Sequence, residues 1–499
     1  MSFIKTYKKE ILLSLLITII YFSTRLFRIM TLPIFTDESI YIRWGQIALH
    51  DPSWRFISLT DGKQPMFVWV EMFALKLIKD PLLAGRLVGV GSGFLTTIGM
   101  FFLGREVFKN KWVGFLSALI YVLFPFALVY DRMALYEPMV NVFTIWSLYI
   151  EVLLIRRVRL DIALILGMVF GGGALTKSDV YFSMILLPFS VILFDFSQKN
   201  ARKKLFKWIG FAILAVSLGY LYYNILRLSP FFGIIGEKND TFIYSFHIWI
   251  KTPFAFVLGN LGGLWNWFTV YVNLPLLLTL IIGLLVSFKY FRERLLLLGW
   301  FAGPFIALAF FGKVMYPRYI LFMVLPLIPI MAFGIYRVYK ILKNMWLGIL
   351  IFLLAMSMSF YANYFIIFNF AHAPIPRSDL NQYINDWPAG GGVNQMLSYF
   401  KSISNKNKIY VGTEGTFGSV PTLAMQIYLE NDSNIITDGY YPIPATLPLK
   451  VAKFSKVMPT YFVFEQTQTP PSAWPLKLIA RYRKGIGNSY MSIYKVVDK

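Results

Sequence analysis

Long apolar runs recur along this 499-residue chain, and they limit its fold more than any other feature. A helix needs roughly 17–25 apolar residues to cross a bilayer, because it rises only about 1.5 Å per residue. About eleven runs reach or approach this length, near residues 11–29, 82–104, 112–130, 137–155, 160–176, 179–197, 206–228, 262–287, 295–311, 319–337 and 345–369. No small-residue cleavage site follows the first run, so we expect it to be retained as a helix. The sequence therefore predicts an α-helical polytopic membrane protein with about eleven transmembrane helices.

The composition supports this class and excludes some kinds of chemistry. Hydrophobic residues make up 57% of the chain and charged residues 15%, whereas soluble domains have about 45–50% and about 25%. The chain has no cysteine, which excludes a thiolate metal site and a cysteine nucleophile. Its three histidines, His50, His247 and His372, are scattered singly, so a histidine-rich metal site is not expected.

Basic residues gather in short segments between the apolar runs and give the chain a formal net charge of +23. In a soluble protein this charge would suggest nucleic acid, but here its placement indicates membrane orientation and anionic lipid or phosphate ligands. If all eleven runs cross, the basic segments fall on one side, at residues 5–9, 105–111, 156–159, 199–207, 289–294 and 337–343. The positive-inside rule makes that side cytoplasmic. We therefore expect a multi-pass plasma-membrane protein with its N-terminus inside and its C-terminus outside.

The first outer loop, residues 30–81, carries two amphipathic segments. Ser39–Leu49 and Gln64–Lys79 both show apolar residues at helical spacing, with Trp44 in the first and Trp69 in the second. Aromatic and lysine residues at such positions suit the headgroup layer, so we expect two helices lying on the membrane surface. The alternative is an ordinary solvated loop, which would leave these apolar residues in water.

The composition changes after about residue 370, which predicts two domains, 1–370 and 371–499. No spanning run follows, and turn-forming residues become frequent. Strands are predicted at 408–413, 434–437, 460–465 and 490–497, and helices at 392–403 and 420–429. We expect a small α/β domain on the extracytoplasmic side.

Three acidic residues fall at the predicted outer face. Asp37 and Glu38 follow the first apolar run, and Asp131 ends the third. Acidic groups beside a membrane helix favour a functional site. The alternative is structural: Thr36 would cap a helix whose first turn contains Asp37 and Glu38. On the same structural reading Asp131 only ends a helix, although the helix dipole disfavours an acid there. Asp37 and Asp131 are candidate bases.

Four cations are predicted at the same face: Lys63, Arg132, Lys177 and Arg318. Alone, each would be read as a side chain that reaches the interface from a helix end. Together with two carboxylates they indicate a phosphate-bearing substrate beside a general base. We expect the cations to bind the phosphate, and Gln64, Glu137 and Tyr319, which accompany them, to contact the substrate. A polyprenyl-phosphate sugar fits this pattern, since its tail lies in the bilayer and its phosphate at the interface.

The motifs also resemble a known family. They are Asp37-Glu38 after the first run, the turn Gly62-Lys63-Gln64-Pro65, Asp131-Arg132 with Glu137-Pro138, Thr176-Lys177 after a glycine run, and Pro317-Arg318-Tyr319. In this order they resemble the GT-C superfamily of membrane glycosyltransferases, above all the protein O-mannosyltransferase and lipid A aminoarabinose transferase group. The resemblance covers about residues 1–370.

The resemblance implies a polyprenyl-monophosphate sugar donor and inversion at the anomeric carbon. It assigns Asp37 as the base, Asp131 as a second essential acid and Lys63 and Lys177 as donor-phosphate contacts. Secondary candidates for the site are Glu38, Glu137 and Arg318. Unlike the aminoarabinose transferases, the chain lacks a clear acidic-plus-histidine cluster, which leaves a divalent metal open. The acceptor, a lipid, glycan or protein, also stays open.

Two other functions compete with this one. A transporter or flippase of lipid-linked sugars would need ionisable groups near the midplane and two related halves, whereas here the charges gather at one face. A purely structural role leaves the clustered outer charges unexplained.

Overall fold

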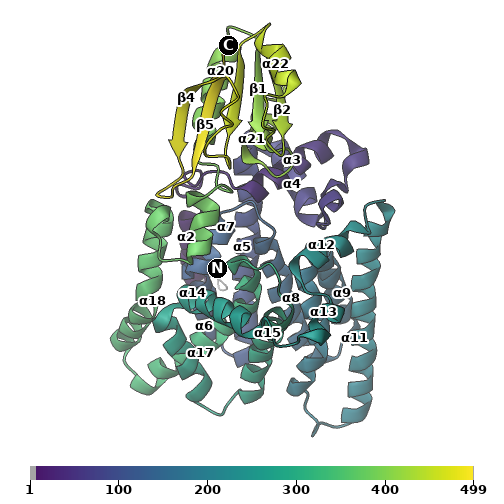
Figure 1. Cartoon of the computed structure of the whole chain (residues 1–499). Coiled ribbons are helices and arrows are strands. Elements are labelled where there is room, and N and C mark those ends of the chain that lie inside the picture. The colour runs from purple at the N-terminus through teal and green to yellow at the C-terminus, as the bar shows by residue number, and fades with distance from the viewer. Residues whose placement is uncertain (1–6, 498–499) are drawn as a thin grey trace. The chain divides into compact units, whose positions relative to one another are not determined.

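The computed structural model describes residues 7–497 and consists mainly of helices (Figure 1). Within these residues, seven helical segments are long and apolar enough to cross a membrane. They are α5 (Pro81–Phe108), α8 (Glu137–Arg157), α11 with η5 (Ala201–Leu228), α14 (Val257–Leu285), α15 (Phe291–Phe311), η6 to α17 (Pro317–Leu342) and α18 (Met345–Phe368). An eighth is obtained if α6 (Lys111–Leu123) and α7 (Pro125–Asp131), bent by 62°, form one span. The bend falls at Pro125, which lacks the backbone N–H needed to continue α6.

Three of the predicted spans correspond to other helices. The first, α2 (Lys8–Leu26), has 19 residues but carries several charges, and α9 (Leu160–Ala174) has only 15. The third is a broken segment, η3 (Ser178–Val180), α10 (Tyr181–Leu186) and η4 (Leu187–Leu193). The helical membrane class is confirmed, while the number eleven and the orientation stay predictions.

The chain divides into two compact units. Unit 1 contains residues 1–27, 55–67 and 87–367, and unit 2 contains residues 28–54, 68–86 and 368–499. The last segment of unit 2 begins close to the predicted domain boundary. Two pieces of the first outer loop belong to unit 2 rather than to the membrane-spanning unit.

Unit 2 contains a five-stranded sheet in the order β2-β1-β3-β5-β4 (Figure 1). Its strands are β1 (Ile409–Glu414), β2 (Ile435–Tyr440), β3 (Thr460–Phe464), β4 (Leu476–Arg483) and β5 (Tyr490–Val496). β1 pairs in parallel with β2 and β3, and helices α21 (Val420–Leu429) and α22 (Leu449–Ser455) make the crossovers. α20 (Val393–Ser404) precedes β1. The predicted α/β domain is confirmed, although β4 and α22 were not predicted.

The two predicted loop helices form, as α3 (Thr36–His50) and α4 (Met66–Leu77). In α3 the predicted apolar side is buried in unit 2: Trp44 is 3% exposed and stacks on Phe417, whose ring centre lies 5.9 Å away. This face of α3 therefore contacts protein rather than lipid headgroups. α4 keeps Phe73 and Leu77 exposed, at 66% and 85%, as an interfacial helix requires.

Candidate active site

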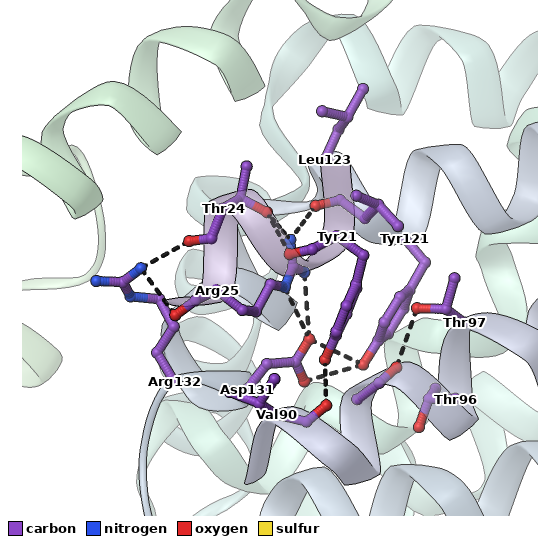
Figure 2. Close-up of polar contacts among 12 residues, drawn as sticks. Tyr21, Thr24, Arg25, Val90, Thr96, Thr97, Tyr121, Leu123, Asp131 and Arg132 are labelled. Carbon is purple, nitrogen blue, oxygen red and sulfur yellow. Dashed lines mark hydrogen bonds and ion pairs between the residues drawn. The ribbon is translucent and has the colours of Figure 1, made fainter. Parts of the chain in front are cut away.

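Asp131 ends α7 and is fully buried in unit 1. Its carboxylate accepts hydrogen bonds from Arg25 of α2, at 3.3 Å from Nε and 3.2 Å from Nη2, and from the Tyr121 hydroxyl at 3.0 Å. Figure 2 shows the carboxylate between these groups, beside Tyr21. Burying an ion costs several kcal/mol unless a partner charge and hydrogen bonds compensate. Arg25 and Tyr121 supply both.

Arg132 donates hydrogen bonds to the C-terminal end of α2, the helix that contains Arg25. Its Nη1 donates to the main-chain carbonyls of Thr24 (2.6 Å) and Arg25 (3.2 Å), as Figure 2 shows. It also donates to the carbonyl of Phe27 (2.9 Å). The last carbonyls of a helix lack partners within it and favour a cation. Asp131 and Arg132 thus both anchor α2, and a phosphate contact for Arg132 stays a prediction.

Glu137, Lys177, Arg318 and Tyr319 come together from distant parts of unit 1. Lys177 Nζ lies 3.0 Å from Glu137 Oε1 and 2.9 Å from Asp179 Oδ2. Its Nζ also lies 4.6 Å from the centre of the Tyr319 ring. Arg318 Nε is 3.9 Å from the same Glu137 oxygen. We call these residues, with Asp179, the lysine cluster.

The electrostatics of the lysine cluster keep Lys177 charged. Burial by itself lowers the pKa of Lys177, but Asp179 and Glu137 outweigh it and raise the pKa above its usual value. Glu137 is the first residue of α8, where the helix dipole favours an acid. Lys177 therefore stays charged beside Arg318, with Glu137 and Asp179 as the acidic groups of the cluster.

The turn that contains Lys63 and Gln64 lies against the lysine cluster. Gln64 Nε2 donates to Ser178 Oγ at 2.9 Å, and Gln64 O accepts from the Tyr136 hydroxyl at 2.9 Å. Lys63 Nζ lies 3.7 Å from Asp61 Oδ2. The structure therefore brings Gln64, Glu137, Lys177, Arg318 and Tyr319 together, with Lys63 on the adjoining turn.

Asp37 belongs to unit 2, where it is the half-buried second residue of α3. The residues just before Asp37 form hydrogen bonds with a turn of the C-terminal segment. Thr36 donates to Pro388 O from its backbone N (3.0 Å) and its Oγ1 (2.9 Å), and Gly390 N donates to Ile34 O (2.8 Å). The predicted cap is therefore wrong in detail: Phe35 holds the N-cap position and Thr36 is the first helical residue, because its hydroxyl binds Pro388 instead.

The turn that holds this segment is itself fixed by a buried ion pair. Lys484 Nζ donates to Trp387 O at 2.9 Å and pairs with Glu465 Oε1 at 2.7 Å, and both side chains are at most 1% exposed. The C-terminal domain therefore supports the residues around Asp37 through main-chain and side-chain bonds.

Glu38 is fully buried beside Asp37 and pairs with Arg86 of α5. Arg86 Nε donates to Oε1 at 2.9 Å and Nη2 to Oε2 at 2.8 Å. Arg86 also donates to three carbonyls of the approaching chain, those of Ile29 (2.6 Å), Leu32 (2.9 Å) and Pro33 (3.1 Å). Glu38 in turn accepts from Phe35 N at 3.0 Å. These bonds fix the path of the chain into Asp37.

Several residues of these networks were not predicted from the sequence: Arg25, Arg86, Tyr121 and Asp179. Arg25 and Arg86 carry a usable signal, because each is a charge within or next to an apolar run, where charges are rare. Tyr121 gives no such signal in a chain with 30 tyrosines. For metals, residues 7–497 contain no group of three or more His, Cys, Asp or Glu side chains that could hold an ion.

Comparisons with known proteins identify a family model and solved structures that are similar to this chain. Residues 62–223 match the family model of dolichyl-phosphate-mannose-protein mannosyltransferase. No curated protein sequence matches the chain. Among solved structures, ArnT from Cupriavidus metallidurans is similar, with a TM-score of 0.57, 13% identity and coverage of 99% of this chain and 98% of ArnT.

The chain shares the fold of ArnT, and part of it matches the mannosyltransferase family model. An oligosaccharyltransferase from Archaeoglobus fulgidus shares this fold, with a TM-score of 0.54 and 13% identity over 93% of this chain and 70% of that protein. The family resemblance predicted from the sequence motifs is thereby confirmed, on a polytopic helical unit joined to a smaller α/β domain.

Proposed function

We propose that this GT-C protein transfers a sugar from a polyprenyl-monophosphate donor to an acceptor at the extracytoplasmic face. The observation that carries the proposal is the lysine cluster, which sets Lys177 and Arg318 around Glu137 next to the Gln64 turn. Two similar structures support the ligand class. ArnT was solved bound to undecaprenyl phosphate, and the Archaeoglobus fulgidus protein AglB with dolichol-phosphate and an inhibitory peptide.

In this mechanism Asp37 acts as the base. Its carboxylate takes the proton of the acceptor hydroxyl as the acceptor oxygen attacks the anomeric carbon of the sugar. The bond from that carbon to the phosphate oxygen breaks, and the phosphate leaves with the electron pair. Attack opposite the leaving group inverts the anomeric carbon. Lys177 and Arg318, with Lys63, stabilise the negative charge that develops on the phosphate.

The other acids then have supporting roles. Asp131 and Glu38 each hold a buried arginine, Arg25 and Arg86, and so fix α2 and the chain around Asp37. We propose that both acids position the site, and a direct catalytic part for either stays a prediction. Arg132 would act in the same way through α2.

The test is sugar transfer in membranes that contain a labelled polyprenyl-phosphate sugar. Asp37→Asn should abolish transfer while the protein still inserts and folds. Asp51→Asn is the matched control, since Asp51 is an exposed acid of the same loop whose carboxylate accepts hydrogen bonds from the neighbouring Ser53. Normal turnover by Asp37→Asn would exclude Asp37 as the base.

The stereochemistry and the competing function are tested in the same preparation. The anomeric configuration of the product, read by NMR, should be opposite to that of the donor. Labelled lipid that crosses vesicle membranes with no covalent product would instead favour a transporter or flippase.

A further inference from the structure

Four polar side chains inside helix α8 take no part in the proposed sugar transfer. Asn141, Thr144, Ser147 and Glu151 are each at most 2% exposed. Within residues 7–497, their side-chain nitrogen and oxygen atoms have no hydrogen-bond partner. Buried polar groups are nearly always bonded, because otherwise the bond they lose to water is not replaced. These side chains therefore require a partner other than the protein.

All four lie on one face of α8. At 3.6 residues per turn they fall within an arc of about 120°, and Glu137 of the lysine cluster falls within the same arc. The arc is centred on the buried side of the helix, opposite the partly exposed Trp146. From Glu137 to Glu151 the helix rises about 21 Å, against about 30 Å for a hydrocarbon core.

One segment that packs against α8 contains a further polar group of the same kind. Segment η4 packs against α8, and its Ser190 is fully buried with an Oγ that has no partner among the described residues. The flank of α8 is different, because Ile150 and Leu154 pack in an apolar cluster with α9. Buried Val140 and Leu148 fall within the same arc, so the four polar side chains form a stripe that is interleaved with apolar residues.

We propose that this face of α8 lines a seam of water molecules that runs inward from Glu137 to Glu151. The chemistry of the stripe selects this ligand. Hydroxyl and amide groups both donate and accept, and a buried water needs two to four such partners. The stripe has no cation to bind an anion, and polar atoms do not suit a lipid tail. Ionisable residues within a span, such as Glu151, typically face the interior of the bundle or a water-filled cavity. The proposal does not rest on sugar transfer.

The natural absence of cysteine makes the test direct. Single cysteines are placed at Thr144 and Ser147, where the change is nearly isosteric, in the otherwise wild-type chain. Each variant is exposed to silver ion, which is small enough to enter a water-wide space and reacts with thiols from water. The thiols that remain are counted with a maleimide after denaturation. Ile145→Cys is the control, because Ile145 is also fully buried at the same depth but packs towards Gly99 of α5.

The cysteines at positions 144 and 147 should react roughly 100-fold or more faster than the one at 145, since a dry buried thiol reacts only when the structure opens locally. Equal rates at all three positions would overturn the proposal, whether all are fast or all are slow. Gel filtration and the thermal midpoint of each variant, compared with the wild type, establish that the fold is retained.

Discussion

The ion pair of Arg86 and Glu38 gives the strongest prediction about the chain around Asp37. Arg86 is fully buried, makes two bonds to Glu38 and three to main-chain carbonyls. Arg86→Leu leaves the Glu38 carboxylate buried without a cation, which costs about 3–5 kcal/mol. Arg86→Lys keeps the charge but cannot form the two-pronged contact, so we expect about 1.5–3 kcal/mol, the value of one charged hydrogen bond.

A double-mutant cycle isolates the pair. Arg86→Leu combined with Glu38→Leu removes both charges, so the double variant should be more stable than Arg86→Leu alone. The assay is an SDS titration in mixed micelles, followed by circular dichroism of the aromatic side chains. Arg105→Leu is the matched control, since Arg105 is exposed on the same helix and its loss should change stability by no more than about 0.5 kcal/mol.

Two results would refute this reasoning. One is an Arg86→Leu variant as stable as Arg105→Leu. The other is a double variant that loses the sum of the two single losses, since that would mean that Arg86 and Glu38 contribute independently.

Three further predictions concern the other networks. Arg25→Met should destabilise unit 1 by about 3–5 kcal/mol, because it leaves the buried Asp131 carboxylate without a cation. An SDS midpoint equal to that of the wild type would contradict this. Lys177→Met should lower kcat/KM for the lipid donor about 10²–10³-fold and Lys177→Arg less; equal kcat/KM values for the Met variant and wild type would argue against a phosphate contact. Burial raises the pKa of Glu465 to about 7, although Lys484 opposes it. The native state then binds more protons than the unfolded state between about pH 4.5 and 7, so stability should fall by about 3 kcal/mol as pH rises through that window. Glu465→Gln should remove this pH dependence, which is measured as the difference between the SDS midpoints at the two ends of that pH window. If the midpoint of the variant still falls as pH rises, another group titrates.

Much of the architecture could be predicted, because membrane spans and buried strands leave periodic apolar patterns. Of the remaining predicted spans, α2 carries several charges and α9 is short, although both expose apolar side chains such as Leu12 and Leu164. In α2, the buried Arg25 is paired by Asp131, so a charge that lipid would exclude is satisfied inside the bundle. Strand β4 escaped prediction because its sequence, Leu476 to Arg483, is basic and lies at the edge of the sheet, where lysine and arginine prevent further pairing.

The site was predicted at the level of residue types but not of partners. Lys177 and Arg318 were expected near a carboxylate, yet Glu137 as their shared partner depends on how α8, η3 and η6 pack, which no local pattern encodes. The same holds for Asp131. Its charge was visible in the sequence, whereas Arg25 and Tyr121, which determine its surroundings, come from two other helices.

The C-terminal domain forms hydrogen bonds with the chain before Asp37 that its sequence does not predict. Thr36 and Ile34 form hydrogen bonds with the turn at Pro388 and Gly390, and Lys484 donates to Trp387 O in the same turn. A flexible loop would let a base sample many positions, and misplacement by about 1 Å can cost about 10²-fold in rate. A base on a first-loop helix therefore benefits from a rigid folded partner, and unit 2 provides one by building α3 into its own core. If Asp37 is the base, as we propose, the domain serves sugar transfer by holding Asp37 in position.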